Sequence, residues 1–244
     1  MSDKVLVELQ GPTLLITLNR PDKRNAFTNS MLESWADALT RAQGDVTVSN
    51  VVVTGAGVAF CAGADLRAYD TDTGASVSNP VSLSVHSMAL AARALDKPYI
   101  AAINGAAVGA GLGMALMADL RFFSDRARVS EGYINVGSFP GDGDTYYLPR
   151  IVGMSRALMM LWSGEMLDAD ECFRTGLADQ VWPHDLLIQR TLEFATRLAA
   201  RPDVLVRAIK RAAYSNRDMS LNDSLNMITG LSAVVSARQS PQGR

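Results

Sequence analysis

The sequence predicts an α/β protein with a helical C-terminal part. Two continuous apolar runs, 50–54 and 99–103, each precede a glycine-rich turn, as is typical of strands buried on both faces. Strand–turn–helix units recur in the first half, and helical patterns dominate from Asp144 onward. With 244 residues, of which 48% are hydrophobic and 20% charged, the chain can bury a large core and is too apolar for disorder.

The first elements are a hairpin and an amphipathic helix. Apolar and polar residues alternate over 5–9 and 14–18, which predicts two paired strands. After a polar loop at 20–25, Ser30 and Glu33 form a capping-box pattern, which predicts a helix beginning at Ser30. The apolar strand at 50–54 follows this helix.

The middle of the chain carries a loop, a helix and three further strands. Small polar residues at 70–80 predict a mobile loop, and the next helix is expected to end near Asp96. The strand at 99–103 and its glycine turn come next. Two shorter strand patterns then occur at 120–123 and 128–131.

Helix signals mark the last third. Asp168 and Glu171 form a second capping-box pattern, Gly176 marks the end of that helix, and Pro202 suits the first turn of another. No low-complexity linker interrupts the chain. We therefore expect residues 1–190 to form the core and residues 191–244 a helical extension within one structural unit.

Composition disfavours several classes of protein. The 23 basic and 25 acidic residues give a net charge of −2, so nucleic acid is not an expected partner. Two cysteines, Cys61 and Cys172, cannot form a disulfide framework, and the start of the chain alternates like a strand instead of a signal peptide, so we expect a cytoplasmic protein. The uncharged stretch 99–118 is rich in Ala and Gly, which predicts a buried strand and helix instead of a membrane span.

The two glycine-rich turns are the chemistry-bearing segments. Residues 53–66 and 103–114 follow the buried strands, and their glycines allow a ligand to approach the backbone closely. Unpaired N–H groups at two such turns can bind an oxyanion, although small residues also serve tight packing alone. The spacing of Gly109, Gly111 and Gly113 does not match a dinucleotide or phosphate loop. His86 and His184 lack metal-ligand spacing, so no metal is expected.

Six segments of the chain are informative when taken together. They are Arg20-Pro-Asp-Lys-Arg-Asn-Ala26, Phe60-Cys-Ala-Gly-Ala-Asp-Leu66, Ala101-Ala-Ile-Asn-Gly105, Gly109-x-Gly111, Ala118-Asp-Leu-Arg121 and Pro149-Arg-Ile-Val-Gly153. In this order they resemble the enoyl-CoA hydratase/isomerase (crotonase) family, and the resemblance runs from about residue 5 to about residue 215. It implies a spiral of ββα units with a C-terminal trimerisation region, a homotrimer or hexamer, and a coenzyme A thioester as substrate without a permanent cofactor.

Carried over by motif, the family's oxyanion donors are the backbone N–H groups of Ala64 and Ala110, which would stabilise an enolate. Lys210 resembles the C-terminal lysine that meets coenzyme A phosphates in this family. A solvated helix face is an equally good interpretation of this lysine. Further residues expected to contact coenzyme A are Lys23, Arg24, Ala62, Asp65 and Leu66.

The chain departs from the family at both hydratase glutamates. Gly113 stands where the first is expected and Tyr133 where the second is expected. Because tyrosine titrates near 10, it is a poor general base at neutral pH. Ordinary two-glutamate hydration is therefore disfavoured.

Four residues are candidates for the missing proton chemistry. The aspartate used by other family members aligns best with Gly141, so Asp142 is the first candidate, followed by Tyr133, Asp144 and Glu131. In a strand, Glu131 and Tyr133 would share a face. The alternative is that Asp142 is a turn residue and Asp144 begins the next helix.

These residues predict an isomerase- or hydrolase-like acyl-CoA enzyme that stabilises a thioester enolate. Two alternatives stay open. One is a non-catalytic acyl-CoA binding protein, and the other is a β-diketone hydrolase that uses this fold without coenzyme A.

Overall fold

The computed structural model describes residues 3–65 and 80–239, and its α/β architecture confirms the predicted class. The expected mobile loop at 70–80, apart from its last residue, and the candidate Leu66 lie outside these ranges. The strands are β1 (Val5–Gln10), β2 (Thr13–Leu18), β3 (Asn50–Gly55), β4 (Ala59–Cys61), β5 (Tyr99–Ile103), β6 (Ala106–Val108), β7 (Leu120–Ser124), β8 (Arg128–Ser130), β9 (Leu167–Asp168) and β10 (Gln180–Trp182).

Helices fill the spaces between and beyond the strands. The α-helices are α1 (Asn29–Gly44), α3 (Pro80–Ala94), α4 (Ala110–Leu116), α5 (Asp144–Val152), α6 (Met154–Ser163), α7 (Ala169–Arg174), α8 (Leu187–Ala199), α9 (Asp203–Ser215) and α10 (Leu221–Gln239). Two short 3₁₀ helices matter for the site, η1 (Pro21–Lys23) and η2 (Ile134–Val136).

The strands form two sheets, one made mainly of longer strands and the other of shorter strands. The larger has the order β1-β2-β3-β5-β7-β10, and the smaller has the order β4-β6-β8-β9. Each of the long strands β3, β5 and β7 is followed by a short strand of the second sheet, and β4, β6 and β8 pair in parallel. This succession is the predicted spiral of ββ units. Because β4 and β6 are paired, the turns that follow them lie side by side.

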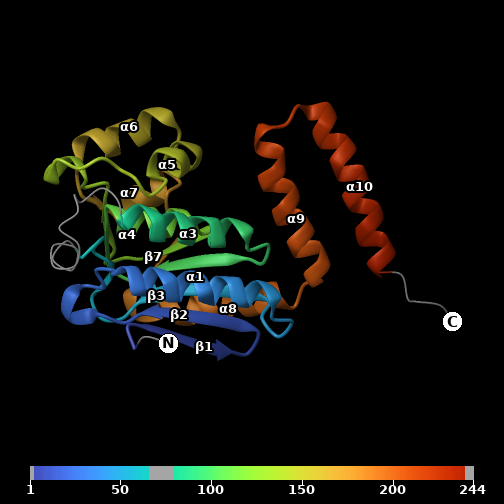
Figure 1. The fold of residues 1–244 in the computed structure, drawn as a ribbon, viewed down its shortest axis with the longest axis horizontal. Helices are drawn as coiled ribbons and strands as arrows, with labels where there is room; N and C mark the ends of the chain where they lie inside the picture. The colour runs from blue at the N-terminus through green and yellow to red at the C-terminus, as the bar shows by residue number, and fades with distance from the viewer. Residues whose placement is uncertain (1–2, 66–79, 240–244) are drawn as a thin grey trace.

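The large sheet is covered on both faces, as its apolar strands predict. Helices α1 and α3 cover one face, and α8 packs on the other (Figure 1). Within β3, Val51 and Val53 join the first core, and Val52 joins the second. The buried Trp35 indole N–H donates to the Tyr99 hydroxyl at 3.0 Å, which satisfies the polar atom that each ring carries.

The capping box predicted at Ser30 and Glu33 is wrong. Helix α1 begins at Asn29, its N-cap is Thr28, and no side chain caps it. The reason is tertiary: Phe27 forms a parallel bridge with Ala64, which holds the chain extended up to the residue before the cap. The second predicted cap is confirmed, since the Asp168 carboxylate accepts from the Glu171 N–H at 2.9 Å.

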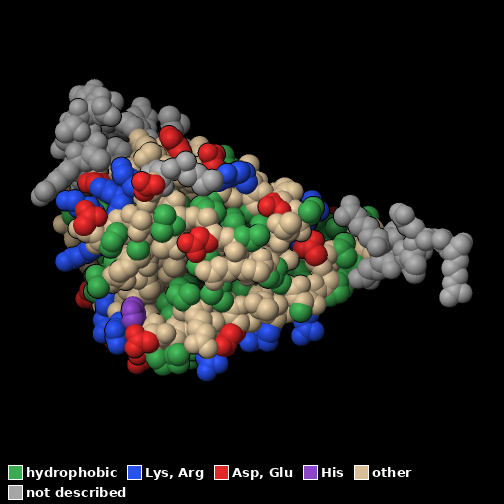
Figure 2. All heavy atoms as spheres, turned by 90° about the horizontal axis from the view of Figure 1, so that it is seen from below, with side chains coloured by type: hydrophobic (Ala, Val, Ile, Leu, Met, Phe, Trp, Pro, Cys, Tyr) green, Lys and Arg blue, Asp and Glu red, His purple; other side chains and the backbone are tan. Residues whose placement is uncertain are grey.

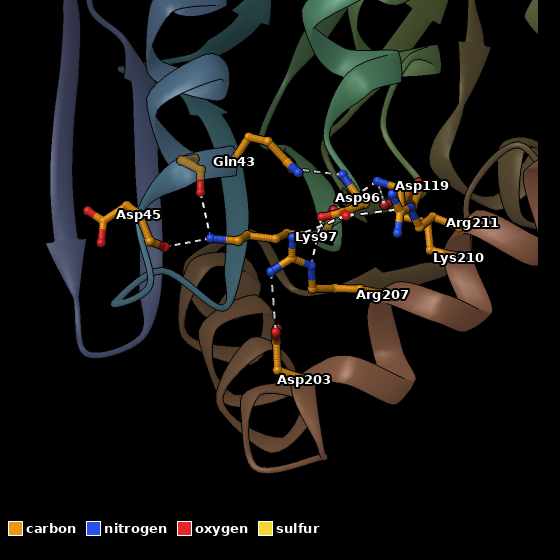
Figure 3. A network of polar contacts seen from close by, with 10 residues as sticks. Gln43, Asp45, Asp96, Lys97, Asp119, Asp203, Arg207, Lys210 and Arg211 are labelled. Carbon is orange, nitrogen blue, oxygen red and sulfur yellow. Dashed lines mark hydrogen bonds and ion pairs between the residues drawn. The ribbon is translucent and has the colours of Figure 1, made fainter. Parts of the chain in front are cut away.

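Helices α9 and α10 form a hairpin that stands away from the sheets (Figure 1). The expected boundary after residue 190 falls inside α8, which packs on the large sheet. No residue of α9 is buried, and this helix is joined to the core through charged side chains (Figure 3). Within the described residues, no helix is long and apolar enough to cross a bilayer.

The face seen from below in Figure 1 is mixed in character. Green apolar side chains are scattered over its middle, and Lys and Arg lie mostly along its edges (Figure 2). Apolar side chains are also exposed on α10, namely Leu221, Leu225, Ile228 and Val234. Exposed apolar side chains of this kind are typical of a surface that contacts another subunit, as the predicted oligomer requires.

Candidate functional site

The two glycine-rich turns meet at their tips. A Cβ at Gly111 would lie 2.1 Å from the Cys61 carbonyl oxygen, so only a glycine fits this close approach without displacing the backbone. A Cβ at Gly63 would lie 3.0 Å from the Val108 oxygen and 3.9 Å from the Ala110 nitrogen. The segment after β4 therefore lies directly against the start of α4.

Backbone hydrogen bonds fix the first turn to the early loop. The Ala62 N–H donates to the Arg24 oxygen at 3.0 Å, and the Phe27 N–H donates to the Gly63 oxygen at 2.9 Å. Asp65 is occupied by an ion pair with Arg20 at 2.8 Å. The early loop thus holds the first turn in place.

Two backbone donors are left over at this meeting point. In the part of the chain that the structure describes, the N–H groups of Ala64 and Ala110 donate to no acceptor. Ala110 is the first residue of α4, and Gly109 before it has φ +52°, a conformation that favours glycine. Both N–H groups thus lie where the turns meet, without an acceptor among the described residues.

Tyr133 links two carboxylates beside these donors. Its hydroxyl lies 2.6 Å from Asp142 Oδ2 and 3.2 Å from Asp144 Oδ2. Its ring lies against the second turn, since a Cβ at Gly109 would be 3.7 Å from ring atom Cζ. Asp142, Asp144 and Tyr133 are thus brought together as one cluster next to the start of α4.

Asp144 lies against the backbone at Gly113. A Cβ at residue 113 would lie 2.5 Å from Asp144 Oδ1, and Asp144 is fully buried. The absence of a side chain at 113 is thus what admits this carboxylate. Asp144 is the first residue of α5, but its carboxylate bonds to Tyr133 and does not serve as the N-cap, which is Gly143.

Glu131 and Tyr133 do not lie on one strand, so the shared strand face considered for them is not formed. Strand β8 ends at Ser130, and Tyr133 is the N-cap of η2, because the Tyr133 N–H turns back to the Glu131 oxygen at 2.7 Å. Glu131 is nevertheless part of the cluster. It is 1% exposed, and neither carboxyl oxygen has a hydrogen-bond partner.

Burial dominates the electrostatics of this cluster. It raises the pKa of Glu131, and the charges of Asp144 and Asp142 raise it further. Burial likewise raises the pKa of Asp144, with Asp142 adding to the effect. The pKa of Tyr133 is raised by burial and by the neighbouring carboxylates, so this residue stays a neutral hydroxyl.

Asp142 has the mildest environment of the three acids. Burial raises its pKa, but the Tyr133 hydrogen bond and the charge of His86 oppose that rise. The sequence analysis assigned His86 no role, and nothing in its spacing signals that α3 brings it near Asp142. His184 lies elsewhere, with Nδ1 3.1 Å from the Ser124 hydroxyl oxygen.

The residues expected to contact coenzyme A fall into two groups. Lys23 and Arg24 are exposed on and just after η1, next to Ala62. Lys210 lies at the opposite end of β5 from the turns, where its ammonium bonds the Asp119 carboxylate at 2.6 Å and the Lys97 oxygen at 2.8 Å (Figure 3). Lys210 is therefore not brought to the cluster within one chain.

A metal ion and the Cys61 thiol are the two other possible sources of chemistry at the turns. Among the described residues, no group of His, Cys, Asp or Glu has an arrangement that would hold a metal ion. Burial raises the pKa of the Cys61 thiol to about 12, and this thiol donates to the Asn25 oxygen. Cys61 is thus held as a neutral packing residue.

Comparisons with known proteins identify the family. The sequence matches the family described as enoyl-CoA hydratase/isomerase over residues 8–240. It is 43% identical to a Mycobacterium tuberculosis protein described as a probable enoyl-CoA hydratase, EchA14, over 85% of this chain and 80% of that protein. It is 34% identical to 4-chlorobenzoyl coenzyme A dehalogenase-1 of Arthrobacter, over 84% of this chain and 76% of that protein.

Solved structures show the same fold. The chain superposes on Pseudomonas aeruginosa DspI with a TM-score of 0.91 and 30% identity, covering 98% of this chain and 97% of that one. The family match spans nearly the whole chain, and the two relatives are described by different reactions, as a probable hydratase and as a dehalogenase. The chain belongs to the enoyl-CoA hydratase/isomerase family.

Proposed function

We propose that this protein is an acyl-CoA enzyme that forms a thioester enolate between the N–H groups of Ala64 and Ala110. The observation that carries the proposal is the pair of unused backbone donors at the meeting point of the two turns. Two hydrogen bonds to the thioester oxygen would stabilise the negative charge that develops there. Loss of one such donor typically costs about 10²–10³ in rate.

Asp142 is the proposed base. Its carboxylate takes the proton from the carbon next to the thioester carbonyl, and the electrons of that C–H bond become the enolate. Because the Tyr133 hydroxyl donates to Asp142 Oδ2 at 2.6 Å, the carboxylate is held in one orientation. Return of the proton to a different carbon gives isomerisation. Hydrolysis instead has Asp142 take a proton from water, whose oxygen bonds to the thioester carbonyl carbon while the carbon–sulfur bond breaks and coenzyme A leaves as the thiol.

Ordinary hydration is not favoured by this arrangement. The two positions that carry glutamates in family hydratases hold Gly113 and Tyr133. Tyr133 donates a hydrogen bond and stays neutral, so it cannot remove a proton from water. We expect crotonyl-CoA to be hydrated far more slowly than about 10 s⁻¹, a typical enzyme turnover.

The test is a panel of acyl-CoAs screened by thermal shift, followed by mass spectrometry of each stabilising compound after incubation. Any reaction found should fall by about 10²–10⁴ in Asp142→Asn, as expected for loss of a general base, while binding is kept. Full activity in Asp142→Asn removes this residue from the proposal. Binding without turnover of any compound indicates an acyl-CoA binding protein, and no stabilisation by any coenzyme A ester contradicts the substrate class.

We also propose that the enzyme is a cytoplasmic homotrimer or hexamer that acts on free acyl-CoA. The exposed apolar side chains of α10 support self-association. Lys23 and Arg24 are placed to meet phosphates near the first turn, and Lys210 would meet them only on a neighbouring subunit. A stable monomer in sedimentation equilibrium at micromolar concentration would contradict this assembly.

A further inference from the structure

The Tyr133 hydroxyl has one proton but two neighbouring carboxyl groups. One hydroxyl carries one proton, yet Tyr133 lies within hydrogen-bond distance of two carboxyl groups, at 2.6 Å and 3.2 Å. If both acids were ionised, the hydroxyl would satisfy only one of them fully. The longer contact, to Asp144, costs less if Asp144 accepts a hydrogen bond from another, protonated acid, because its carboxylate then competes less for the Tyr133 proton.

A second observation places a proton on this side of the cluster. Both Glu131 oxygens and Asp144 Oδ1 are buried without a hydrogen-bond partner. Two ionised carboxylates in such surroundings would repel each other, and no Lys or Arg of residues 3–65 and 80–239 bonds to either of them. One proton held between the two acids removes the repulsion.

We propose that Glu131 and Asp144 share one proton, and that this proton makes Tyr133 direct its own hydroxyl proton to Asp142. Glu131 is thereby a positioning residue: it acts on Asp142 through Asp144 and Tyr133 and touches no substrate. The inference rests on the proposed function only in taking Asp142 as the base.

The charged groups facing this proton are few. Glu131 faces Asp144 from α5 and Asp142 from the preceding loop, and Asp142 in turn faces His86 from α3. In the part of the chain that the structure describes, the titratable groups that face Glu131 directly are Asp144, Asp142 and the neutral Tyr133. Loss of the shared proton would therefore leave Asp142 and Asp144 competing for the Tyr133 hydroxyl, and Asp142 would lose its fixed orientation.

Infrared spectroscopy of the ligand-free protein tests the shared proton without requiring any activity. A protonated carboxyl has a C=O stretch that a carboxylate lacks. We expect this band in the wild type at neutral pH and expect its loss in Glu131→Gln, because the Gln amide can donate to Asp144 and lets it ionise. Glu165→Gln, which changes an exposed glutamate, should keep the band.

Asp144→Asn removes the other holder of the proton and should also abolish the band, so the test survives if Glu131→Gln does not fold. The absence of the band from folded wild type, or its persistence in Glu131→Gln, overturns the inference. A band that behaves as expected in a protein without acyl-CoA activity would instead contradict the proposed function alone.

Enzyme kinetics distinguish a residue that positions Asp142 from one that only supports the fold. With a substrate that turns over, Glu131→Gln should move the alkaline limb of the kcat profile to lower pH and leave KM unchanged. An equal loss of kcat at every pH would mean that Glu131 only supports the fold, and it would overturn the positioning role.

Discussion

The two ends of β5 are built in opposite ways. At its carboxyl end the two glycine turns touch through backbone atoms, with a Cβ at Gly111 only 2.1 Å from the Cys61 oxygen. At the amino end of β5, ion pairs between side chains join α9 to the core: Arg207 pairs with Asp96 at 2.8 Å, and Lys210 pairs with Asp119 at 2.6 Å (Figure 3). No residue of α9 is buried.

The difference sets how each region responds to change. Backbone packing at the turns leaves no free space, so a single added methyl group must displace a main-chain segment. Charged contacts at α9 are partly exposed, adjust their geometry and are screened by salt. We therefore expect the site to be rigid and the helical hairpin to be adjustable.

The largest effect is expected from Gly111→Ala. The added Cβ would separate the turns, which should lower the free energy of unfolding by about 1–3 kcal/mol or more and cost enolate stabilisation in addition. Chemical denaturation and steady-state kinetics measure the two effects. Gly44→Ala is the matched control, because a Cβ there meets nothing within 4 Å; equal effects of the two variants would disprove tight contact between the turns.

A smaller effect is expected from pH on the wild type. Burial and nearby carboxylates raise the folded-state pKa of Glu131 and Asp144, so the folded protein holds protons that the unfolded chain has already released. The contribution of these two groups to stability should therefore be fully present below their unfolded pKa values and should decline as pH rises toward the folded values.

Chemical denaturation over a series of pH values measures this slope. Glu131→Gln removes the larger contribution, so its free energy of unfolding should depend less on pH than that of the wild type. Identical slopes in the two proteins would show that Glu131 ionises normally in the folded state.

The smallest effect is expected at α9. Lys210→Met removes the ion pair to Asp119 and should lower stability by about 1 kcal/mol, because Asp119 keeps its hydrogen bonds from the Tyr99 N–H and the Tyr214 hydroxyl. Hydrogen exchange should increase in α9 and stay unchanged in β5. Arg174→Met, which breaks an exposed pair with Glu171, serves as control; faster exchange in β5 would mean that α9 supports the core.

The elements and the turns could be predicted because their signals are local. The apolar run at 50–54 and the glycines after it appear consecutively in the sequence, and the structure keeps both. The start of α1 could not be placed, because the bridge between Phe27 and Ala64 joins residues far apart in the chain. Local capping patterns carry no information on such a bridge.

The cluster at Tyr133 was only partly predictable. Asp142, Asp144 and Tyr133 are close in sequence, and their joint presence in one loop and helix start was a usable signal. The burial of Glu131 gave no signal in the sequence, since its two unpartnered carboxyl oxygens depend on how α5 packs beside β8. The missing side chain at Gly113 was the one clue that space existed there for another group.

The contact between Gly113 and Asp144 also constrains how this site can change. A side chain at 113 and a carboxylate at 144 claim the same space, because a Cβ at 113 would lie 2.5 Å from Asp144 Oδ1. A side chain at 113 would therefore require the Asp144 carboxylate to turn away from its present place beside Tyr133. Gly113→Glu alone would displace that carboxylate, so residues 113 and 144 are expected to change together.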